Sequence, residues 1–393
     1  MRTLTKDRTK KAQTVWDDFN GNVPGVYLIG WELATTRFHA PSNNKRQPLP
    51  SLNGRTLDWL ILDEVHRAAN HATKTYKTFK NTRTQHLTLL SATPAGSQPV
   101  NIYGPLTLLQ PNNAPDFYTF GETFFHYRDA PFGRIWGGER KPGLLRASFK
   151  CWHTTPPQAI QRTTPPPPII QRIPTPLTRE QKRQYQEMHH QAQEYLDANP
   201  LIPRLPLHLS LRLRQITLAP IQATPNGVNK HGETTYTHTY SPDAASPKIA
   251  ATLDILKDLP GEKVLILTHS ATFVPALTRA LTKSGHKVVT LTGGSDKQQW
   301  REFITDPSVN VLVATIEAVA EGVDGLQNVC HVEIWLSQSN SLTKNIQATG
   351  RLHRIGQKRR VIRYLLQAPD TIDTRVYDRL EGREQALRKS GLL

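Results

Sequence analysis

Short runs of consecutive apolar residues recur along the chain, with helix-forming and turn-forming segments between many of them. Eight of these runs predict buried strands, at residues 26–31, 57–62, 86–90, 263–268, 287–291, 310–315, 332–336 and 361–366. Their apolar residues are continuous rather than alternating, which is typical of strands covered by helices on both faces. The pattern therefore predicts an α/β fold built on parallel sheets.

The predicted strands form two clusters, and the segment between them has a different character. Eight prolines lie within residues 156–176, a density that excludes a helix interior or a central strand. Residues 178–199 predict a helix with Thr178 as its N-cap, and the polar, turn-rich residues 222–247 predict a linker or surface loop. We therefore expect three parts, at residues 1–155, 156–245 and 246–393.

Composition narrows the class of protein. The chain has 393 residues, 37% of them hydrophobic, and a mean hydropathy of −0.50, which is typical of a soluble globular protein. It contains no apolar run near the roughly 20 residues that cross a membrane, and its basic N-terminus lacks the apolar core of a secretion signal. Two cysteines, Cys151 and Cys330, are too few for a disulfide framework or a zinc site, which favours the cytoplasm.

The charge balance is strongly basic. Lys and Arg number 49 against 32 acidic residues, giving a net charge of +17 and a pI near 9.9. Six of the basic residues and no acids lie between Arg351 and Arg363. Such clustering favours a polyanionic partner such as nucleic acid, although a solubilising surface charge is the alternative.

One predicted strand ends at two adjacent carboxylates. In "LILDEVHRAANH" (60–71), Asp63 and Glu64 follow the apolar run directly, and His66 comes two residues later. Ligands bind beyond the carboxyl ends of parallel strands, and two carboxylates there can hold Mg²⁺ and activate an attacking water. Phosphoryl transfer needs both functions. Acids are common at strand ends, so the pair alone is weak evidence.

Three further stretches strengthen this interpretation. "LLSATP" (89–94) ends another apolar run with the small hydroxyl residues Ser91 and Thr93. "ATIEAVAEGVDGLQNV" (314–329) contains Gly322, which permits close backbone approach, and the acceptor Asp324.

The third stretch is "NIQATGRLHRIGQKRR" (345–360). On a helix, Gln347, Arg351 and Arg354 fall at positions i, i+4 and i+7, on one face. Two guanidinium groups on one face suit phosphate oxygens, and a solvated basic face is the alternative.

Together, in this order, these stretches resemble the Swi/Snf-like branch of the superfamily-two nucleic-acid-dependent ATPases. "LILDEVHRAANH" resembles the family's second motif, "LLSATP" its third, "ATIEAVAEGVDG" its fifth and "QATGRLHRIGQ" its sixth. The last is the most specific, because "HRIGQ" is a hallmark of the Swi/Snf-like branch. The resemblance covers nearly the whole chain from about residue 20. It implies two RecA-like lobes, joined by the proline-rich and helical segment, that close over ATP and track along duplex DNA.

The resemblance also implies roles for individual residues. Asp63 would coordinate Mg²⁺, Glu64 would act on the attacking water, and Arg351 and Arg354 would be arginine fingers. Three residues would contact or sense the nucleotide: Gln347, Gly322 and Asp324.

Other roles concern coupling and nucleic acid. Residues that would couple the nucleotide state to the DNA are His66, Ser91, Ala92, Thr93 and His353. Candidate contacts to DNA phosphates are Ser270, Gly293 and Thr315. For His66 and His353 an ordinary surface or supporting histidine is the alternative.

The phosphate-binding loop of such enzymes is missing from this sequence. Its signature is G-x-x-x-x-G-K-[ST], and the dipeptide Gly-Lys occurs nowhere in the 393 residues. The resemblance therefore implies that the first lobe is incomplete at its N-terminus, and that the strand, loop and helix that open it lie before Met1. Shortened or divided helicases of this kind are familiar in bacteriophage genomes, which this sequence resembles, and this would place the protein in the host cytoplasm.

Three functions stay open. In the first, the chain is part of a DNA-dependent ATPase, a helicase or duplex translocase, whose loop comes from an upstream segment or a second polypeptide. In the second, it is a non-hydrolysing DNA-binding accessory or a helicase remnant. In the third, it is a motor subunit associated with a nuclease, against which "HRIGQ" argues.

Overall fold

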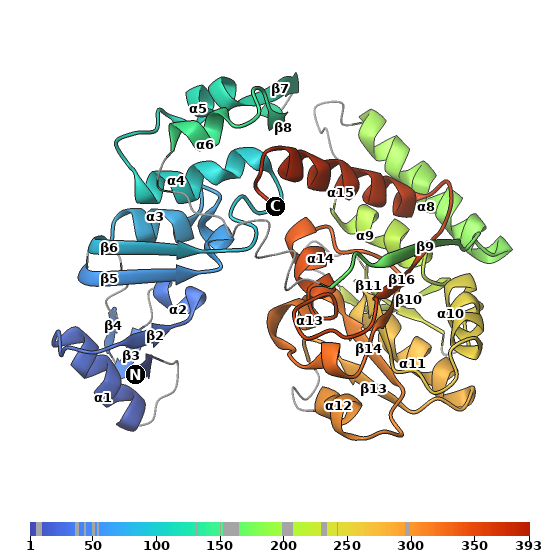
Figure 1. Ribbon diagram of the computed structural model, residues 1–393. Helices are drawn as coiled ribbons and strands as arrows, with labels where there is room; N and C mark the ends of the chain where they lie inside the picture. The colour runs from blue at the N-terminus through green and yellow to red at the C-terminus, as the bar shows by residue number, and fades with distance from the viewer. Residues whose placement is uncertain are drawn as a thin grey trace. The chain divides into compact units, whose positions relative to one another are not determined.

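The computed structural model describes residues 1–4, 10–35, 39–42, 45–48, 52, 55–130, 133–149, 151, 165–198, 207–228, 234–241, 243–294 and 299–393. The chain divides into two compact units (Figure 1). Unit 1 comprises Met1–Ala130, Arg134–Trp152 and Glu384–Leu393, and unit 2 comprises Pro131–Gly133 and His153–Arg383. This division places the described part of the segment 156–245 in unit 2 and the last ten residues in unit 1. The predicted boundary at residue 155 and the prolines before residue 165 lie outside the described residues.

Unit 2 is built on a six-stranded sheet in the order β13-β14-β12-β15-β16-β9. Every neighbouring pair is parallel, which confirms the predicted α/β class. The strands are β9 (Ile169–Pro174), β12 (Val264–Thr268), β13 (Val288–Leu291), β14 (Val311–Thr315), β15 (Val332–Trp335) and β16 (Ile362–Gln367). Five of them coincide with the five apolar runs predicted in this part of the chain.

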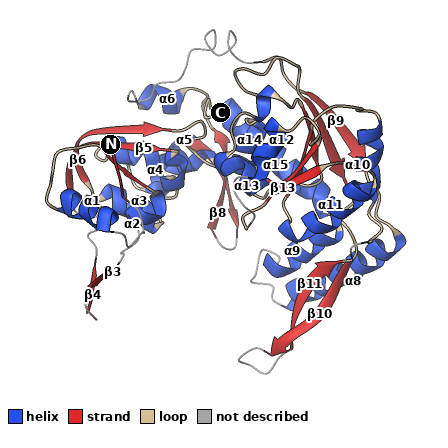
Figure 2. Ribbon diagram, turned by 90° about the horizontal axis from the view of Figure 1, so that it is seen from below, coloured by secondary structure: helices blue, strands red, loops and turns tan. Residues whose placement is uncertain are grey.

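Helices cover both faces of this sheet (Figure 2). One core packs side chains of α12 (Glu302–Thr305), α13 (Ile316–Gly322), α14 (Leu342–Thr349) and α15 (Ile372–Lys389) against alternate strand residues such as Leu265. The opposite core packs α10 (Pro247–Lys257) and α11 (Val274–Lys283) against the residues between, such as Ile266. The central strands β12 and β14 are buried at every position, as their continuous apolar sequence predicted.

The segment that precedes the second predicted strand cluster is more ordered than its sequence suggested. The predicted helix is present as α8 (Arg179–Ala198), and Thr178 and Gln181 bond reciprocally at its start, as in a capping box. A second helix, α9 (Leu207–Ile216), follows it.

The prediction of a linker or surface loop at residues 222–247 is wrong over most of its length. β10 (Ile221–Val228) and β11 (Thr234–Tyr240) form an antiparallel hairpin there (Figure 2). The run "TTYTHTY" of β11 is rich in threonine and tyrosine, which favour strands. Because these residues are not strongly apolar, the search for apolar runs did not detect the strand.

Unit 1 contains small sheets rather than one large sheet. β1 (Arg2–Leu4) pairs with β2 (Tyr27–Ile29), and β5 (Thr56–Asp63) pairs in parallel with β6 (Arg83–Leu90). Antiparallel pairs are formed by β3 (His39–Ser42) with β4 (Lys45–Pro48), and by β7 (Phe125–Ala130) with β8 (Gly133–Glu139). The helices are α1 (Lys10–Asn20), α2 (Trp31–Thr35), α3 (Lys74–Lys80), α4 (Tyr103–Leu109), α5 (Phe117–Phe124) and α6 (Leu144–Ser148).

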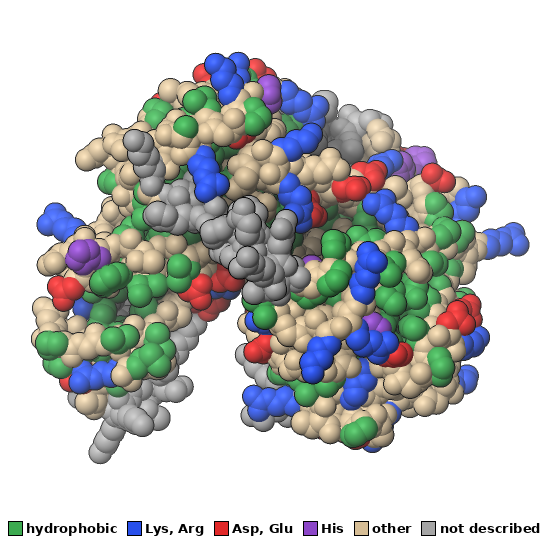
Figure 3. Space-filling view, viewed as in Figure 1, with side chains coloured by type: hydrophobic (Ala, Val, Ile, Leu, Met, Phe, Trp, Pro, Cys, Tyr) green, Lys and Arg blue, Asp and Glu red, His purple; other side chains and the backbone are tan. Residues whose placement is uncertain are grey.

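Among the residues that the structure describes, side chains cover the β5–β6 pair on one face only, which corrects the prediction that both faces of these strands are buried. Leu60 and Leu62 point into a core shared with residues of α1, α2 and α3. On the other face Trp59 is 61% exposed, Ile61 60% and Leu90 48%. Hydrophobic side chains accordingly reach the surface in unit 1 (Figure 3). No helix among the described residues is long and apolar enough to cross a membrane.

Candidate active site

The two adjacent carboxylates lie where β5 ends. The Asp63 backbone carbonyl accepts a hydrogen bond of 3.0 Å from the Trp31 indole, and Asp63 Oδ1 accepts one of 2.9 Å from the Glu64 backbone N–H. Glu64 has a left-handed backbone conformation, with φ 57° and ψ 48°. This conformation is costly for a residue with a side chain, and such strain is concentrated at functional sites. Here it turns the chain sharply from β5 into the short 3₁₀ helix Val65–Ala68.

His66 joins the carboxylates to the neighbouring strand. Its Nδ1 lies 3.1 Å from Glu64 Oε2 and 3.4 Å from Ser91 Oγ. Ser91 directly follows β6, whose last residue pairs with Asp63, and its hydroxyl accepts a 3.1 Å bond from the Thr93 N–H. The structure thus brings Asp63, Glu64, His66 and Ser91 together at the carboxyl edge of one parallel pair. Thr93 is buried beside them, and Ala92 is exposed.

The donor set at this edge suits Mg²⁺ bound together with a substrate. The described residues contain no group of three or more His, Cys, Asp or Glu that could hold a metal by themselves. Mg²⁺ is usually bound through one or two carboxylates, several waters and substrate phosphates. The exposed Asp63 carboxylate fits that mode of binding.

The predicted helical face formed by Gln347, Arg351 and Arg354 is not present. α14 ends at Thr349, and both arginines lie in the turns that follow. Gly350 ends the helix because it lacks a side chain that would favour helical continuation. Gln347 alone of the three is helical.

The two arginines instead have different tertiary partners in unit 2. The Arg351 guanidinium donates to the carbonyl oxygens of Val319, at 3.1 Å, and Ala320, which lie in the last turn of α13. It therefore caps that helix, whose final carbonyls have no partner within the helix. Arg354 Nη1 lies 2.7 Å from Asp324 Oδ1. Asp324 follows Gly322 at the end of α13, so Gly322, Asp324, Arg351 and Arg354 form one cluster.

His353 lies against the proline segment. Its Nε2 is 3.1 Å from the carbonyl oxygens of both Pro165 and Pro166. The Arg360 Nε donates to the next carbonyl, that of Pro167, at 2.9 Å. These bonds hold the segment before β9 onto the turns that follow α14.

The three candidate DNA contacts share one edge of the unit 2 sheet. Ser270, Gly293 and Thr315 lie at or just after the carboxyl ends of β12, β13 and β14, which are neighbours in parallel register. Gly293 is exposed, whereas Ser270 is 6% and Thr315 5% exposed. Of the three, only Gly293 is open to solvent in this structure.

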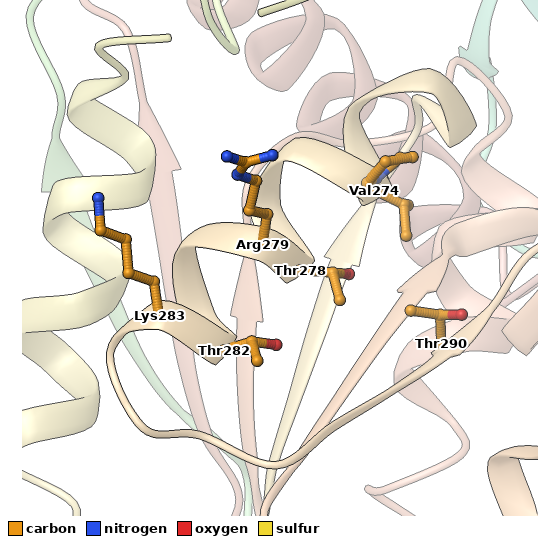
Figure 4. A pocket seen from close by; sticks show the side chains of 7 residues that line it. Val274, Thr278, Arg279, Thr282, Lys283 and Thr290 are labelled. Atoms are coloured by element: carbon orange, nitrogen blue, oxygen red, sulfur yellow. The ribbon is translucent and has the colours of Figure 1, made fainter. Parts of the chain in front are cut away.

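A shallow pocket lies elsewhere in unit 2, between α11 and β13 (Figure 4). Its lining contains three threonines and two cations, and none of the predicted site residues. The lining residues are Val274, Pro275, Thr278, Arg279, Thr282, Lys283 and Thr290.

Sequence reasoning missed a buried charged cluster near the carboxyl edge of the unit 2 sheet. Lys248 of α10 is fully buried, and its ammonium donates to the Asp373 carboxylate of α15 and to the Leu336 carbonyl after β15. His269, after β12, bonds through Nδ1 to Ser337 Oγ at 2.6 Å. Burial, together with nearby cations, holds the pKa of His269 well below 6.5. Nothing in the sequence around Lys248, in the first turn of α10, indicates that its side chain faces inward.

Two stretches of the chain match models of known domain families. Residues 43–220 match the family model described as the SNF2-related domain, and residues 247–356 match the helicase conserved C-terminal domain. Each predicted site residue falls inside one of the two ranges. The two matches support the predicted resemblance to Swi/Snf-like superfamily-two helicases at the level of these domains.

Individual relatives are distant. The chain is 26% identical over 335 residues to Protein CHROMATIN REMODELING 4 of Arabidopsis thaliana, an alignment covering 83% of this chain and 14% of that protein. It is 32% identical over 148 residues to an uncharacterized ATP-dependent helicase of Schizosaccharomyces pombe, covering 36% and 14%. It is 23% identical over 331 residues to an uncharacterized ATP-dependent helicase of Bacillus subtilis, covering 81% and 57%.

Among solved structures, the chain is similar to the Sulfolobus solfataricus SWI2/SNF2 ATPase core in complex with double-stranded DNA. That match has a TM-score of 0.43 and 21% identity, and covers 85% of this chain and 69% of the other. The chain spans only 14% of the length of the first two curated relatives.

Proposed function

We propose that this chain, with its SNF2-related and helicase C-terminal domains, is part of a DNA-dependent ATPase that acts as a helicase or duplex translocase. The observation that carries the proposal is the cluster at the end of β5 and β6. The Asp63 carboxylate, assigned to the metal, accepts the Glu64 backbone N–H, and His66 lies within hydrogen-bonding distance of the Glu64 carboxylate and of Ser91 after the next strand.

Each residue of the cluster has a part in hydrolysis. Mg²⁺, when bound with ATP, neutralises charge that develops on the phosphate oxygens. Asp63 would hold that ion, and Glu64 would orient the attacking water and accept its proton. His66 contacts both Glu64 and Ser91, so it would position the Glu64 carboxylate. Through the same contacts, a movement of the "SATP" segment would move that carboxylate.

The open face of the β5–β6 pair supports the proposal that a further segment supplies the phosphate loop. Parallel strands occur almost only in sheets covered on both faces. Here Trp59, Ile61 and Leu90 form an exposed apolar face on the pair that ends at Asp63. A strand and helix packed on this face would bring their connecting loop to the same carboxyl edge, since that is where ligands bind. The segment would be an upstream part of the same polypeptide or a second chain.

The electrostatic balance supports DNA as the partner. Lys and Arg side chains are visible over both units (Figure 3), and the net charge is +17. Phosphate contacts made by such residues would bind duplex DNA with little sequence preference.

A non-hydrolysing DNA-binding accessory is the second candidate function. The absence of any Gly-Lys dipeptide from the 393 residues favours it, because the loop lysine binds the β- and γ-phosphates. The left-handed Glu64 argues for hydrolysis, since a remnant has no use for a strained carboxylate.

An ATPase assay separates the two functions. The chain alone should hydrolyse ATP negligibly with or without DNA. Fusion to, or mixing with, a strand-loop-helix segment carrying the G-x-x-x-x-G-K-[ST] signature should restore DNA-stimulated turnover. In the restored protein Glu64→Gln should nearly abolish turnover, whereas Asp58→Asn, on the same strand, should not. Turnover that survives Glu64→Gln within about twofold would contradict the assigned base.

A variant of the open face tests where the segment docks. Ile61→Lys should prevent restoration by the added segment, because a buried ammonium opposes packing. Val228→Lys provides the control, since Val228 is 67% exposed on β10 and belongs to no proposed interface. Equal restoration with both variants would exclude this face as the docking site.

A further inference from the structure

Unit 1 carries a cluster of aromatic rings that the hydrolysis site does not use. Helix α5 packs against the β7–β8 hairpin, and Phe117 lies 5.6 Å from Tyr118 and 5.9 Å from Trp136, centroid to centroid. Trp136 in turn lies 5.5 Å from Tyr127 on the neighbouring strand. We call Tyr118, Tyr127, Trp136 and the enclosed Arg134 the aromatic surface.

Arg134 holds the rings of this surface in place. Its guanidinium carbon lies 4.5 Å from the centroid of Tyr127, 5.6 Å from Tyr118 and 6.0 Å from Trp136. Its nitrogens also pair with Glu122 and Asp129. A cation bonded to two carboxylates and set among three ring faces makes the surface rigid before any ligand binds.

The indole of Trp136 needs a residue without a side chain opposite it. A Cβ at Gly121 of α5 would lie 2.3 Å from the Trp136 ring, closer than real contacts allow. Gly121 thus permits α5 and the hairpin to approach closely, and it fixes the orientation of the rings that face outward.

Two of the rings are open to solvent, and the sequence around them is basic. Tyr118 is 57% and Tyr127 41% exposed. Residues 126–146 contain five Lys or Arg and two acids, and one of those acids, Glu139, is buried and occupied by the backbone N–H groups of Gly143 and Leu145. Exposed aromatic faces flanked by cations are the usual combination in proteins that bind single-stranded nucleic acid, where bases stack and cations follow the backbone.

The aromatic surface is also connected to the hydrolysis segment. His71, the last residue of "LILDEVHRAANH", stacks on Phe117 with a centroid distance of 4.1 Å and an interplanar angle of 26°. Phe117 contacts both Tyr118 and Trp136. A continuous series of rings therefore leads from the segment after Asp63 and Glu64 to the exposed tyrosines.

We propose that the aromatic surface binds unpaired bases of single-stranded DNA by stacking on Tyr118 and Tyr127. The proposal rests on the function proposed above, because it assigns one strand, rather than the duplex alone, to unit 1. It favours strand separation over simple duplex tracking, since stacking requires bases that have left their pairs.

The test compares two probes of equal charge. An oligothymidylate and an abasic oligomer of the same length present the same phosphates, and only the first has bases to stack. The full chain should bind the oligothymidylate at least about tenfold more tightly, because bases that stack on aromatic side chains add to the affinity. Tyr118→Ala should remove about that factor, and Tyr118→Phe should retain it because the ring remains.

Tyr236→Ala is the matched control, because Tyr236 is 51% exposed on β11 of unit 2. It should leave the preference for bases unchanged. Equal affinity of the native chain for both probes, or an unchanged preference in Tyr118→Ala, would overturn the proposal and leave a protein partner as the occupant of the surface. Binding of a blunt duplex is measured in parallel. If the chain binds the duplex but shows no preference for bases, the role of the aromatic surface is contradicted and the proposed function is not.

Discussion

Arg354 Nη1 lies 2.7 Å from Asp324 Oδ1, so one predicted arginine finger is paired with a residue predicted to sense the nucleotide. The other finger, Arg351, donates to carbonyls at the end of α13. Arg354 must therefore exchange one carboxylate for phosphate oxygens to act on ATP. Arg351 already has a structural role, and this difference separates the expected effects of changing each arginine.

Arg354→Ala in the loop-bearing protein should slow hydrolysis by about 10³-fold or more, in line with arginine fingers. Arg354→Lys should restore little, because an ammonium cannot make the planar two-pronged contact. Steady-state ATPase rates measure this. Arg360→Ala is the control, since Arg360 is exposed and bonds to Pro167. If both alanine variants leave turnover unchanged, the run from Arg351 to Arg363 is only a basic face.

Arg351→Ala should lower stability as well as turnover. It leaves the last carbonyls of α13 without their charged donor, and hydrogen bonds to charged groups contribute about 1.5–3 kcal/mol. Urea unfolding of the chain without ATP measures this loss. Arg354→Ala should leave the unfolding midpoint nearly unchanged. Equal midpoints for the two variants would show that Arg351 does not cap the helix in solution.

Lys248→Met should destabilise the fold by about 3–5 kcal/mol, because it leaves the Asp373 carboxylate buried without its partner. Replacing both residues, as in Lys248→Met with Asp373→Leu, should recover much of the loss. Lys257→Met, on the exposed side of the same helix, should leave the unfolding midpoint unchanged. A double variant as unstable as the single one would show that the pair contributes through more than mutual neutralisation.

Stability should fall as the pH drops below 6.5. The folded state keeps His269 neutral because its pKa is depressed, while the unfolded state binds a proton below 6.5. The unfolded state then holds more protons, so the free energy of unfolding falls by up to about 1.4 kcal/mol per pH unit for this group. His269→Gln should reduce that slope between about pH 7 and pH 5. His331, whose pKa burial also lowers, accounts for part of the remaining slope. An unchanged slope in His269→Gln would contradict the assignment.

Duplex DNA binding should weaken steeply with added salt and depend little on sequence, through release of counterions from the phosphates. Titrations at several salt concentrations measure the slope. Arg128→Ala and Arg140→Ala, both exposed in the basic segment beside the aromatic surface, should each reduce it. A flat salt dependence would show that the net charge of +17 serves solubility rather than binding.

The sequence predicted the strands and the residues that follow them better than it predicted contacts made at a distance. All eight predicted strands are present, because uninterrupted apolar runs such as that of β12 have few other structures open to them. Asp63 and Ser91 come together because adjacent parallel strands end at one edge. The prediction from helical spacing was wrong beyond Thr349, because the helix ends at Gly350. Arg351 bonds instead to α13, more than 30 residues earlier in the sequence. Ring contacts such as that of His71 with Phe117 depend on tertiary packing, and no local pattern encodes them.

The β5–β6 pair, covered on one face by the described residues, affects how prone the protein is to aggregate in a cell. This parallel ribbon has Trp59 and Ile61 exposed, and its outer strand edges pair with no other described strand. An apolar face and open strand edges are the features that lead chains to associate with copies of themselves. If a further segment covers this face, as proposed above, a chain made without that segment would be a target for chaperones and a source of aggregates. Production of the covering segment would govern how much of the protein stays usable. Supply of the proposed segment would then regulate the abundance of the protein as well as its proposed ATPase activity.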